Sequence, residues 1–143
     1  LTTKECGRHV KSLLKKDGVV LADLIDDVEK GLLLPSYIKT LEAVFGQGRV
    51  NLIVPLKSQN VGIATCIVVA SSQPLDMADF TKKVRAIRGN DMVSRVMPQE
   101  VLHERTADRQ AVVLTDDYVP VDNLIAPLFE QRFGYREQQK TGS

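Results

Sequence analysis

The sequence VGIATCIVVA, residues 61–70, is the longest apolar run of the chain. It is rich in valine and isoleucine and is bounded by polar turn residues, a pattern typical of a strand buried on both faces. A second apolar run, residues 50–56, ends just before the linker KSQN, residues 57–60. A linker that short forces an antiparallel pair, because a parallel connection needs a dozen residues or more. The two runs therefore predict a hairpin whose second strand lies at the centre of a sheet.

Length and composition indicate one ordinary domain. The chain has 143 residues, of which 43% are hydrophobic and 26% are charged, as in a typical soluble protein. The net charge of +1 favours neither nucleic acid nor acidic membranes as partners. The sequence shows no signal peptide and no apolar run long enough for a transmembrane helix, so we expect no membrane insertion by this segment and a cytoplasmic location.

Cysteines and histidines give no sign of a metal site. Cys6 and Cys66 both occupy apolar positions, which favours buried, reduced thiols over a disulfide or a reactive thiol. His9 and His103 lie far apart in the sequence, and no Cys-x-x-Cys motif occurs. We therefore expect no bound metal.

The first part of the chain reads as a helix followed by a strand. TTKE at residues 2–5 is a capping box, in which the Glu5 carboxylate is expected to reach back to the start of the helix. An apolar stripe follows at helical spacing, and Gly18 is a candidate C-cap. Residues 19–25 read as a strand, with Asp23 near its C-terminal end. Residues 26–31 read as a polar loop.

A second helix is predicted after Pro35-Ser36. Its apolar stripe consists of Tyr37, Ile38, Leu41, Val44 and Phe45. The sequence GQG at residues 46–48 closes this helix, whereas a phosphate-binding loop follows a strand and opens a helix. An ordinary turn is therefore the better interpretation of the glycines.

The element order of residues 1–73 predicts an α/β fold. Helix, strand, helix, strand and strand follow one another, so we expect a right-handed parallel strand-helix-strand unit followed by an antiparallel hairpin. The second half of the Rossmann-like sheet in S-adenosylmethionine-dependent methyltransferases ends in this order. Because one fold hosts several chemistries, that similarity indicates a partial Rossmann-like sheet and no particular reaction.

Residues 74–136 read as a helical and irregular C-terminal extension packed on that sheet, and residues 137–143 as a tail. Pro74 and Asp76 precede a helix with an apolar stripe, formed by Met77, Phe80, Val84 and Ile87. Its basic residues are better explained as a solvated surface than as a phosphate site. Pro98 divides residues 92–109, and a short helix is expected on each side of it.

The sequence QAVVLTDDYVPVD, residues 110–122, carries the most specific pattern. A short apolar run delivers Thr115-Asp116-Asp117-Tyr118 to a turn, and Pro120 keeps the next segment extended. Asp122 is expected to cap a helix that Pro127 splits into two pieces. Two interpretations of the turn remain open: substrate-facing acids, or an Asx-turn with the Tyr118 ring packed on the core.

The motif LTDDYVPVD, residues 114–122, resembles the C-terminal signature of spermidine synthase-like proteins, the aminopropyltransferases on the methyltransferase-type Rossmann fold. LTTKE at residues 1–5, LKKDGV at residues 14–19 and TLEAVF at residues 40–45 are similar to other segments of that family, so the resemblance covers nearly the whole chain. It implies transfer of an aminopropyl group from decarboxylated S-adenosylmethionine to a polyamine. It also implies Asp116, Asp117, Tyr118 and Asp23 as candidate substrate-binding residues.

Part of that family's pattern is not found in this sequence. The Gly-rich turn after the first strand, the acidic residue that holds the ribose and the acidic motif after the fourth strand have no counterpart. We therefore expect this chain alone to bind no cofactor and to be inactive. Decarboxylated S-adenosylmethionine or S-adenosylmethionine is expected as the co-substrate of a longer parent protein. In this family the parent is sometimes membrane-tethered. The first residue, Leu1, and the end KTGS suggest a processed or truncated chain with a disordered tail or cloning scar.

Two other function classes stay open. A methyltransferase would use the same fold, and a non-catalytic module would dimerise or bind a partner. In every case a half-sheet leaves a strand unpaired, and natural proteins protect such edges. We therefore expect the strand at residues 19–25 to be covered by a second copy, an extra element or another chain, and we expect the partner to be a second copy or the missing N-terminal half.

Overall fold

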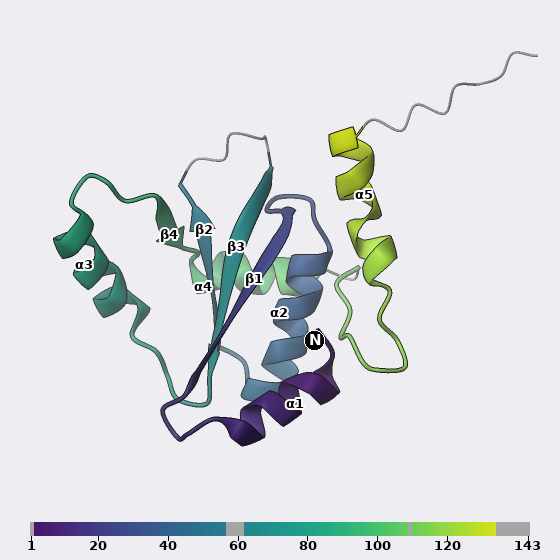
Figure 1. Ribbon diagram of the computed structural model, residues 1–143, viewed down its shortest axis with the longest axis horizontal. Coiled ribbons are helices and arrows are strands. Elements are labelled where there is room, and N and C mark those ends of the chain that lie inside the picture. Colours follow the sequence, from purple (N-terminus) through teal and green to yellow (C-terminus); the bar gives the residue numbers. More distant parts are fainter. Residues whose placement is uncertain (1, 57–61, 109, 134–143) are drawn as a thin grey trace, which may run out of the picture.

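The computed structural model describes residues 2–56, 62–108 and 110–133, and its centre is a four-stranded sheet in the order β1-β3-β2-β4 (Figure 1). The strands are β1 Val19–Asp27, β2 Val50–Pro55, β3 Ile63–Ser71 and β4 Ser94–Val96. The helices are α1 Lys4–Leu13, α2 Leu33–Phe45, α3 Met77–Arg88, α4 Gln99–Thr106 and α5 Val121–Phe133. The division at residues 73 and 136 stays a prediction.

Strand β3 lies between β1 and β2 and runs antiparallel to both. This confirms the predicted hairpin and its central second strand. β1 and β2 therefore run in the same direction, but they do not touch. The predicted parallel strand-helix-strand unit is met in strand direction only, because every pair of neighbouring strands in the described sheet is antiparallel. A parallel Rossmann sheet is therefore not shown. The short link after β2 lets β3 fold back at once and take the position between them.

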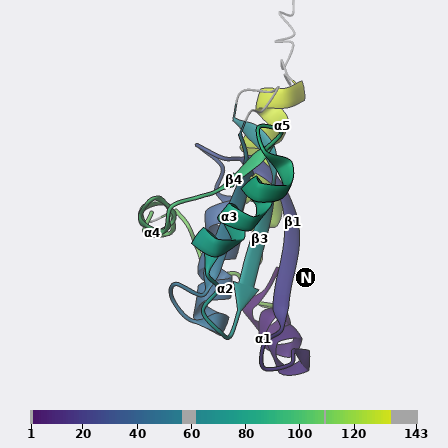
Figure 2. The ribbon, with the colours of Figure 1, turned by 90° about the vertical axis from the view of Figure 1, so that its left-hand side faces the viewer.

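One face of the sheet carries the hydrophobic core. α2 and α4 lie on this face (Figure 2). α2 buries nine of its thirteen residues, and the sheet contributes alternate side chains to the same core. These strand residues are Leu24, Val50, Leu52, Val54, Ala64, Cys66, Val68 and Ala70. A helix with that much buried surface owes its stability to packing rather than to propensity.

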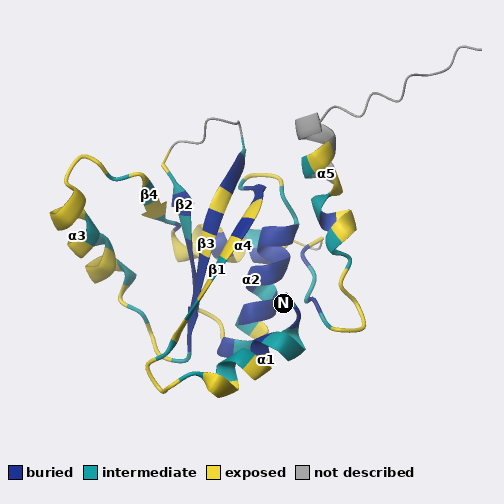
Figure 3. Ribbon diagram, viewed as in Figure 1, coloured by how far each residue is buried: buried dark blue, intermediate teal, exposed yellow. Residues whose placement is uncertain are grey.

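The opposite face is only partly covered. Leu21 is 69% exposed and Ile67 on β3 is 37% exposed, and Figure 3 shows exposed residues alternating with buried ones along β1 and β3. The prediction that residues 61–70 are buried on both faces is met on the core face and only in part on the open face, where Ile63 and Val69 are buried but Thr65 and Ile67 are exposed. Val61 lies outside the described residues. β1 is an edge strand, and what covers it stays a prediction.

Several predicted boundaries are wrong. α1 ends at Leu13 with Leu14 as its C-cap, so Gly18 instead closes a separate turn onto the Lys15 carbonyl. A strand, β4, replaces the helix expected before Pro98, because it pairs with β2; the helix after Pro98 is confirmed. α5 continues past Pro127, since packing of its first two turns, with Leu124 buried, holds it on the core.

Two hydroxyl groups on α2 fix the segment at residues 110–114. Thr40 Oγ1 accepts the Leu114 amide at 2.8 Å, and Ser36 Oγ accepts the Val112 amide at 3.2 Å. Each hydroxyl in turn donates to the carbonyl four residues earlier, that of Ser36 for Thr40 and that of the N-cap residue Leu32 for Ser36. Both side chains are fully buried. Since a buried amide needs a partner, these hydroxyls determine where the segment lies.

Replacing Thr40 with valine keeps the side-chain shape and removes the acceptor for the Leu114 amide. We expect the free energy of unfolding to fall by about 1–3 kcal/mol, the penalty for an unsatisfied buried donor. Chemical denaturation measures this change. Thr81→Val is the matched control, because the Thr81 hydroxyl serves only its own helix, donating to the Met77 carbonyl. Equal losses in both variants would contradict the assigned role of Thr40.

Candidate functional site

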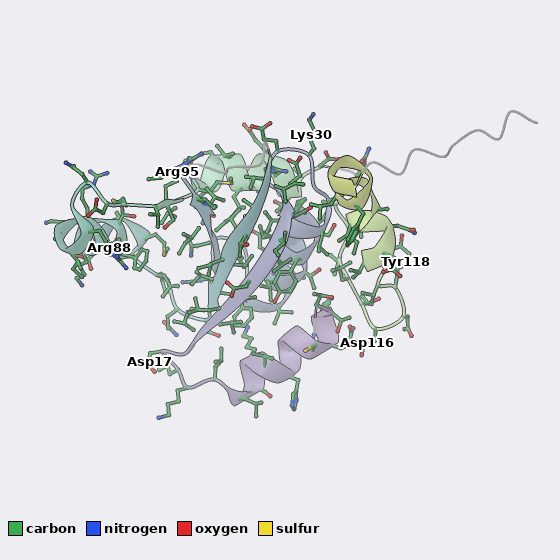
Figure 4. All side chains as sticks on the ribbon, turned by 45° about the horizontal axis from the view of Figure 1, so that its top comes forward. Asp17, Lys30, Arg88, Arg95, Asp116 and Tyr118 are labelled. Atoms are coloured by element: carbon green, nitrogen blue, oxygen red, sulfur yellow. The ribbon has the colours of Figure 1, made fainter. Side chains whose placement is uncertain are left out.

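The acidic motif forms a tight turn. Thr115 and Tyr118 exchange two backbone hydrogen bonds, of 3.1 and 3.0 Å, which leaves Asp116 and Asp117 at the tip. The turn lies beside the N-terminal end of α1, where the Lys4 amide donates to the Leu114 carbonyl at 2.8 Å. Figure 4 shows Asp116 and Tyr118 on this side of the molecule.

Glu5 anchors the turn to α1. The Asp116 amide donates to Oε2 of Glu5 at 3.0 Å. The prediction that this carboxylate reaches back to its own helix start is therefore wrong. Thr3 is the N-cap of α1, with its hydroxyl accepting the Cys6 amide at 3.3 Å. The capping pattern located the helix start, but it could not show that Glu5 has a partner more than a hundred residues away.

The side chains at the tip of the turn face solvent. Tyr118 is 56% exposed, so its ring is not packed in the core as the structural interpretation expected. Asp116 and Asp117 are exposed, and within the described part of the chain neither carboxylate accepts a hydrogen bond. These three groups are therefore available to a ligand, and the substrate-facing interpretation stays a prediction.

Asp23 is not part of the same site. It is the fifth of nine residues in β1, not near the end of the strand, and it lies opposite Ile67. Its exposed side chain shares the open face of the sheet with Leu21 and Ile25. The acidic turn instead follows the segment held by α2, on the core face. The sheet therefore separates Asp23 from the three residues of the turn.

Asp26 was predicted to lie in a loop, yet it is buried near the end of β1, only 1% exposed. Its Oδ2 accepts the Leu34 amide at 2.7 Å and its Oδ1 accepts the Asp27 amide at 2.9 Å. Leu32, the residue at the N-cap position of α2, has no side chain that can cap the helix. Asp26 therefore caps α2 from a neighbouring strand. The missing cap in LLLP, residues 32–35, was the signal that an acceptor had to come from elsewhere.

Asp27 shapes the connection that follows. It is also buried, and its Oδ1 accepts the amides of Glu29 and Lys30 at 2.8 and 2.9 Å. Two glycines leave room for the paired carboxylates. A methyl group on Gly31 would collide with Asp26, and one on Gly62, where φ is +86°, would collide with Asp27. The carboxyl end of β1 is thus built around two buried acids.

Burial determines the titration of this cluster. It raises the pKa of Asp26, and the amides of Leu34 and Asp27 partly oppose that rise. The buried Cys66 thiol, on the neighbouring strand, has its pKa raised to about 11, first by burial and then by the negative charge of Asp26. This thiol stays protonated at neutral pH. Both cysteines are free; Cys66 is buried as predicted, whereas Cys6 is only half-buried, and their reduced state stays a prediction.

A pocket of about 310 Å³ opens next to this cluster. The β1–α2 connection forms one wall and the end of α4 with the following residues forms the other; Figure 4 labels Lys30 in this region. Its charged lining residues are Glu29, Lys30, Glu104, Arg105 and Asp108. Ligands of open α/β sheets bind outside the carboxyl ends of strands, where this pocket lies.

The described residues provide no recognisable place for a nucleoside. No Gly-rich turn joins a strand to a following helix, since Gly46 and Gly48 close α2 and the β1–α2 connection holds the single Gly31. Among these residues no group of three or more His, Cys, Asp or Glu side chains is arranged to hold a metal ion. No helix in the described part is long and apolar enough to cross a bilayer.

Comparison with known proteins shows the fold alone. No protein-family model matches the sequence, and a comparison with curated proteins gives no match. The structure is similar to the crystal structure of a probable spermidine synthase from Corynebacterium glutamicum ATCC 13032, with a TM-score of 0.63 and 17% sequence identity. The similarity covers 82% of this chain but only 42% of the other. This chain therefore has a spermidine synthase-like α/β fold and spans less than half of that protein's length.

Removing the Asp26 carboxylate tests its capping role. Asp26→Ala leaves the Leu34 and Asp27 amides without acceptors, so we expect the free energy of unfolding to fall by about 1–3 kcal/mol. Gly31→Ala alone should also destabilise, because its methyl group meets that carboxylate. In the double variant the carboxylate is gone, so the two losses should be clearly less than additive. Full additivity in denaturant titrations would show that Gly31 and Asp26 do not interact.

The raised pKa of Asp26 predicts how stability depends on pH. In the unfolded chain the acid ionises near its ordinary value of 3.8, whereas the folded protein keeps its proton to higher pH. The Asp26 carboxyl therefore stabilises the folded state below pH 3.8. This stabilisation is lost as the pH rises through the pKa that Asp26 has in the folded protein. We expect wild type to lose stability relative to Asp26→Asn over this range. A constant difference between the two unfolding curves across these pH values would refute the shift.

Proposed function

We propose that this chain is the C-terminal part of a spermidine synthase-like transferase, which moves an aminopropyl group from decarboxylated S-adenosylmethionine to an amine of a polyamine. The observation that carries the proposal is the fold similarity, which covers 82% of this chain and 42% of a probable spermidine synthase. The LTDDYVPVD motif supports it from the sequence. A further part of the parent protein provides the nucleoside site.

The chemistry requires carboxylates around the polyamine. A neutral amine nitrogen attacks the aminopropyl carbon attached to sulfur; a C–N bond forms, the C–S bond breaks, and the sulfonium leaves as a neutral thioether. The amine releases a proton, which the acidic motif of the missing half accepts. The other amino groups of the polyamine remain ammonium ions. We assign Asp116 and Asp117 to bind one of them and the Tyr118 hydroxyl to orient it, because all three are exposed in one turn.

The free edge of β1 is where the rest of the parent would join the sheet. β1 is nine residues long and pairs with β3 on one side, while its other side pairs with no strand of the described sheet. Leu21 and Ile25 are exposed on the open face beside this edge. Long, apolar edges promote unwanted association unless they are covered. A strand of the nucleoside-binding half along β1 would cover the edge and extend the sheet.

A non-catalytic module is the second candidate. The free edge of β1 favours it, because a strand edge with no catalytic half paired along it can bind another chain. The methyltransferase alternative shares the fold and differs in the transferred group. Both alternatives predict that no aminopropylated product forms.

The test begins with sequencing the gene upstream of Leu1 and expressing the whole reading frame. The product is assayed by mass spectrometry with decarboxylated S-adenosylmethionine and putrescine. We expect spermidine from the longer protein and none from the 143-residue chain. No spermidine from the longer protein, methylation in its place, or an unrelated upstream domain would refute the proposal.

Neutralising the acidic turn tests the assigned residues. In the active protein, Asp116→Asn with Asp117→Asn should raise the KM for the polyamine at least about tenfold, since a hydrogen bond to a charged group contributes roughly 1.5–3 kcal/mol. kcat should change less. Asp17→Asn, an exposed acid in the turn before β1, is the control and should leave both constants unchanged. An unchanged KM in the double variant would remove the turn from the substrate site.

A further inference from the structure

Helix α3 has an apolar stripe that the chain itself does not bury. Met77, Phe80, Val84 and Ile87 follow one another at spacings of three, four and three residues, which places them on one side of the helix. No residue of α3 is buried; Phe80 is 43% exposed and Ile87 is 83% exposed. The predicted stripe is therefore confirmed as a helical pattern. The chain half-buries Met77 and Val84 and leaves Phe80 and Ile87 exposed.

The structure nevertheless forms α3 as a complete helix. The Asp76 side chain caps its first turn by accepting the Asp79 amide at 2.8 Å, and Gly89 ends it. α3 has twelve residues, and helices shorter than about 12–15 residues are marginal in water without tertiary packing. An exposed stripe on so short a helix therefore points to a contact with another molecule.

The surface beside the stripe is also apolar. A groove of about 420 Å³ lies between the start of α3 and the open face of the sheet. Met77, Phe80 and Leu75 form its α3 side, and Leu21 and Ile67 belong to its sheet side. Figures 1 and 2 show α3 standing at the β4 end of the sheet, away from α2 and α4. The stripe and the groove thus form one continuous surface.

The stripe is complementary to itself when two copies of α3 run antiparallel. If the two-fold axis passes between the helices at the level of Lys82, whose side chain is on the far side of each helix, Met77 of one helix meets Ile87 of the other, and Phe80 meets Val84. Both contacts pair apolar side chains, and the two-fold symmetry makes each contact occur twice in the dimer. No other segment is needed to cover the stripe.

The charges favour the antiparallel arrangement over the parallel one. The first turn of α3 begins with Asp76 and Asp79, and the last turn holds Arg85 and Arg88. Antiparallel copies bring the acidic end of each helix level with the basic end of the other, and they also oppose the two helix dipoles. Parallel copies would place like charges side by side. Of these four residues only Asp79 is ion-paired in the described chain, with Lys83 at 2.6 Å.

We propose that α3 and the adjoining groove are an interface between two copies of this chain, related by a two-fold axis that passes between the two helices at the level of Lys82. A pair of twelve-residue helices alone falls short of the roughly 1,200 Å² of a stable interface, so the sheet side of the groove contributes to it. This interface leaves the outer edge of β1 free. It therefore does not depend on the proposed transferase function.

Sedimentation equilibrium of the 143-residue chain over a range of concentrations tests the interface. We expect a monomer–dimer equilibrium in wild type and at least a tenfold weaker dimer for Ile87→Glu, because the charge is placed in the apolar layer. Ile87 is exposed, so folding should be unaffected, and circular dichroism checks this. Leu13→Glu, at an exposed position on α1, is the control and should dimerise like wild type.

Charge exchange tests the antiparallel direction. A chain with Arg85→Glu and Arg88→Glu and a chain with Asp79→Lys should each dimerise more weakly than wild type, and a mixture of the two should form a heterodimer. A monomeric wild type, a dimer that Ile87→Glu leaves intact, or no association in the mixture would each overturn the proposal. A dimer disrupted only by Leu21→Lys would assign the contact to the β1 side of the sheet instead and would equally overturn it.

Discussion

The buried carboxylate of Asp26 is the contact on which the rest of the structure depends. It joins the end of β1 to the first turn of α2, a helix with no capping residue of its own. Once α2 is fixed there, Ser36 and Thr40 on it determine the path of residues 110–114. That path sets the position of the acidic turn. One buried acid thus connects the sheet, the central helix and the candidate substrate residues.

The sequence was sufficient to predict the hairpin, because a four-residue link leaves the chain no alternative to an antiparallel pair. It also located the start of α3 and the acidic turn, because both depend on local capping and turn residues. It could not show that β4 is a strand that pairs with β2, since that pairing is long-range. The roles of Asp26 and Glu5 were missed for the same reason: their partners are distant in sequence or lie on another element.

The open face of the sheet and the acidic turn are on different sides of the molecule, and they suggest different roles. The core face is complete, with α2, α4 and the segment before the turn packed on it. The other face exposes large apolar side chains on β1 and β3. This chain covers 42% of a probable spermidine synthase, and it leaves this face of the sheet open. Both observations fit our proposal that the chain is one part of a larger assembly. The free edge of β1 and the surface at α3 would then receive different partners.

Hydrogen–deuterium exchange along β1 tests this explanation most directly. Every amide of β1 that points away from β3 should exchange rapidly in the 143-residue chain, because no described strand pairs with that edge. In the complete gene product, the same amides should be strongly protected by a strand of the nucleoside-binding half. Equal exchange in the two proteins would contradict the claim that this chain is the C-terminal part of a spermidine synthase-like sheet.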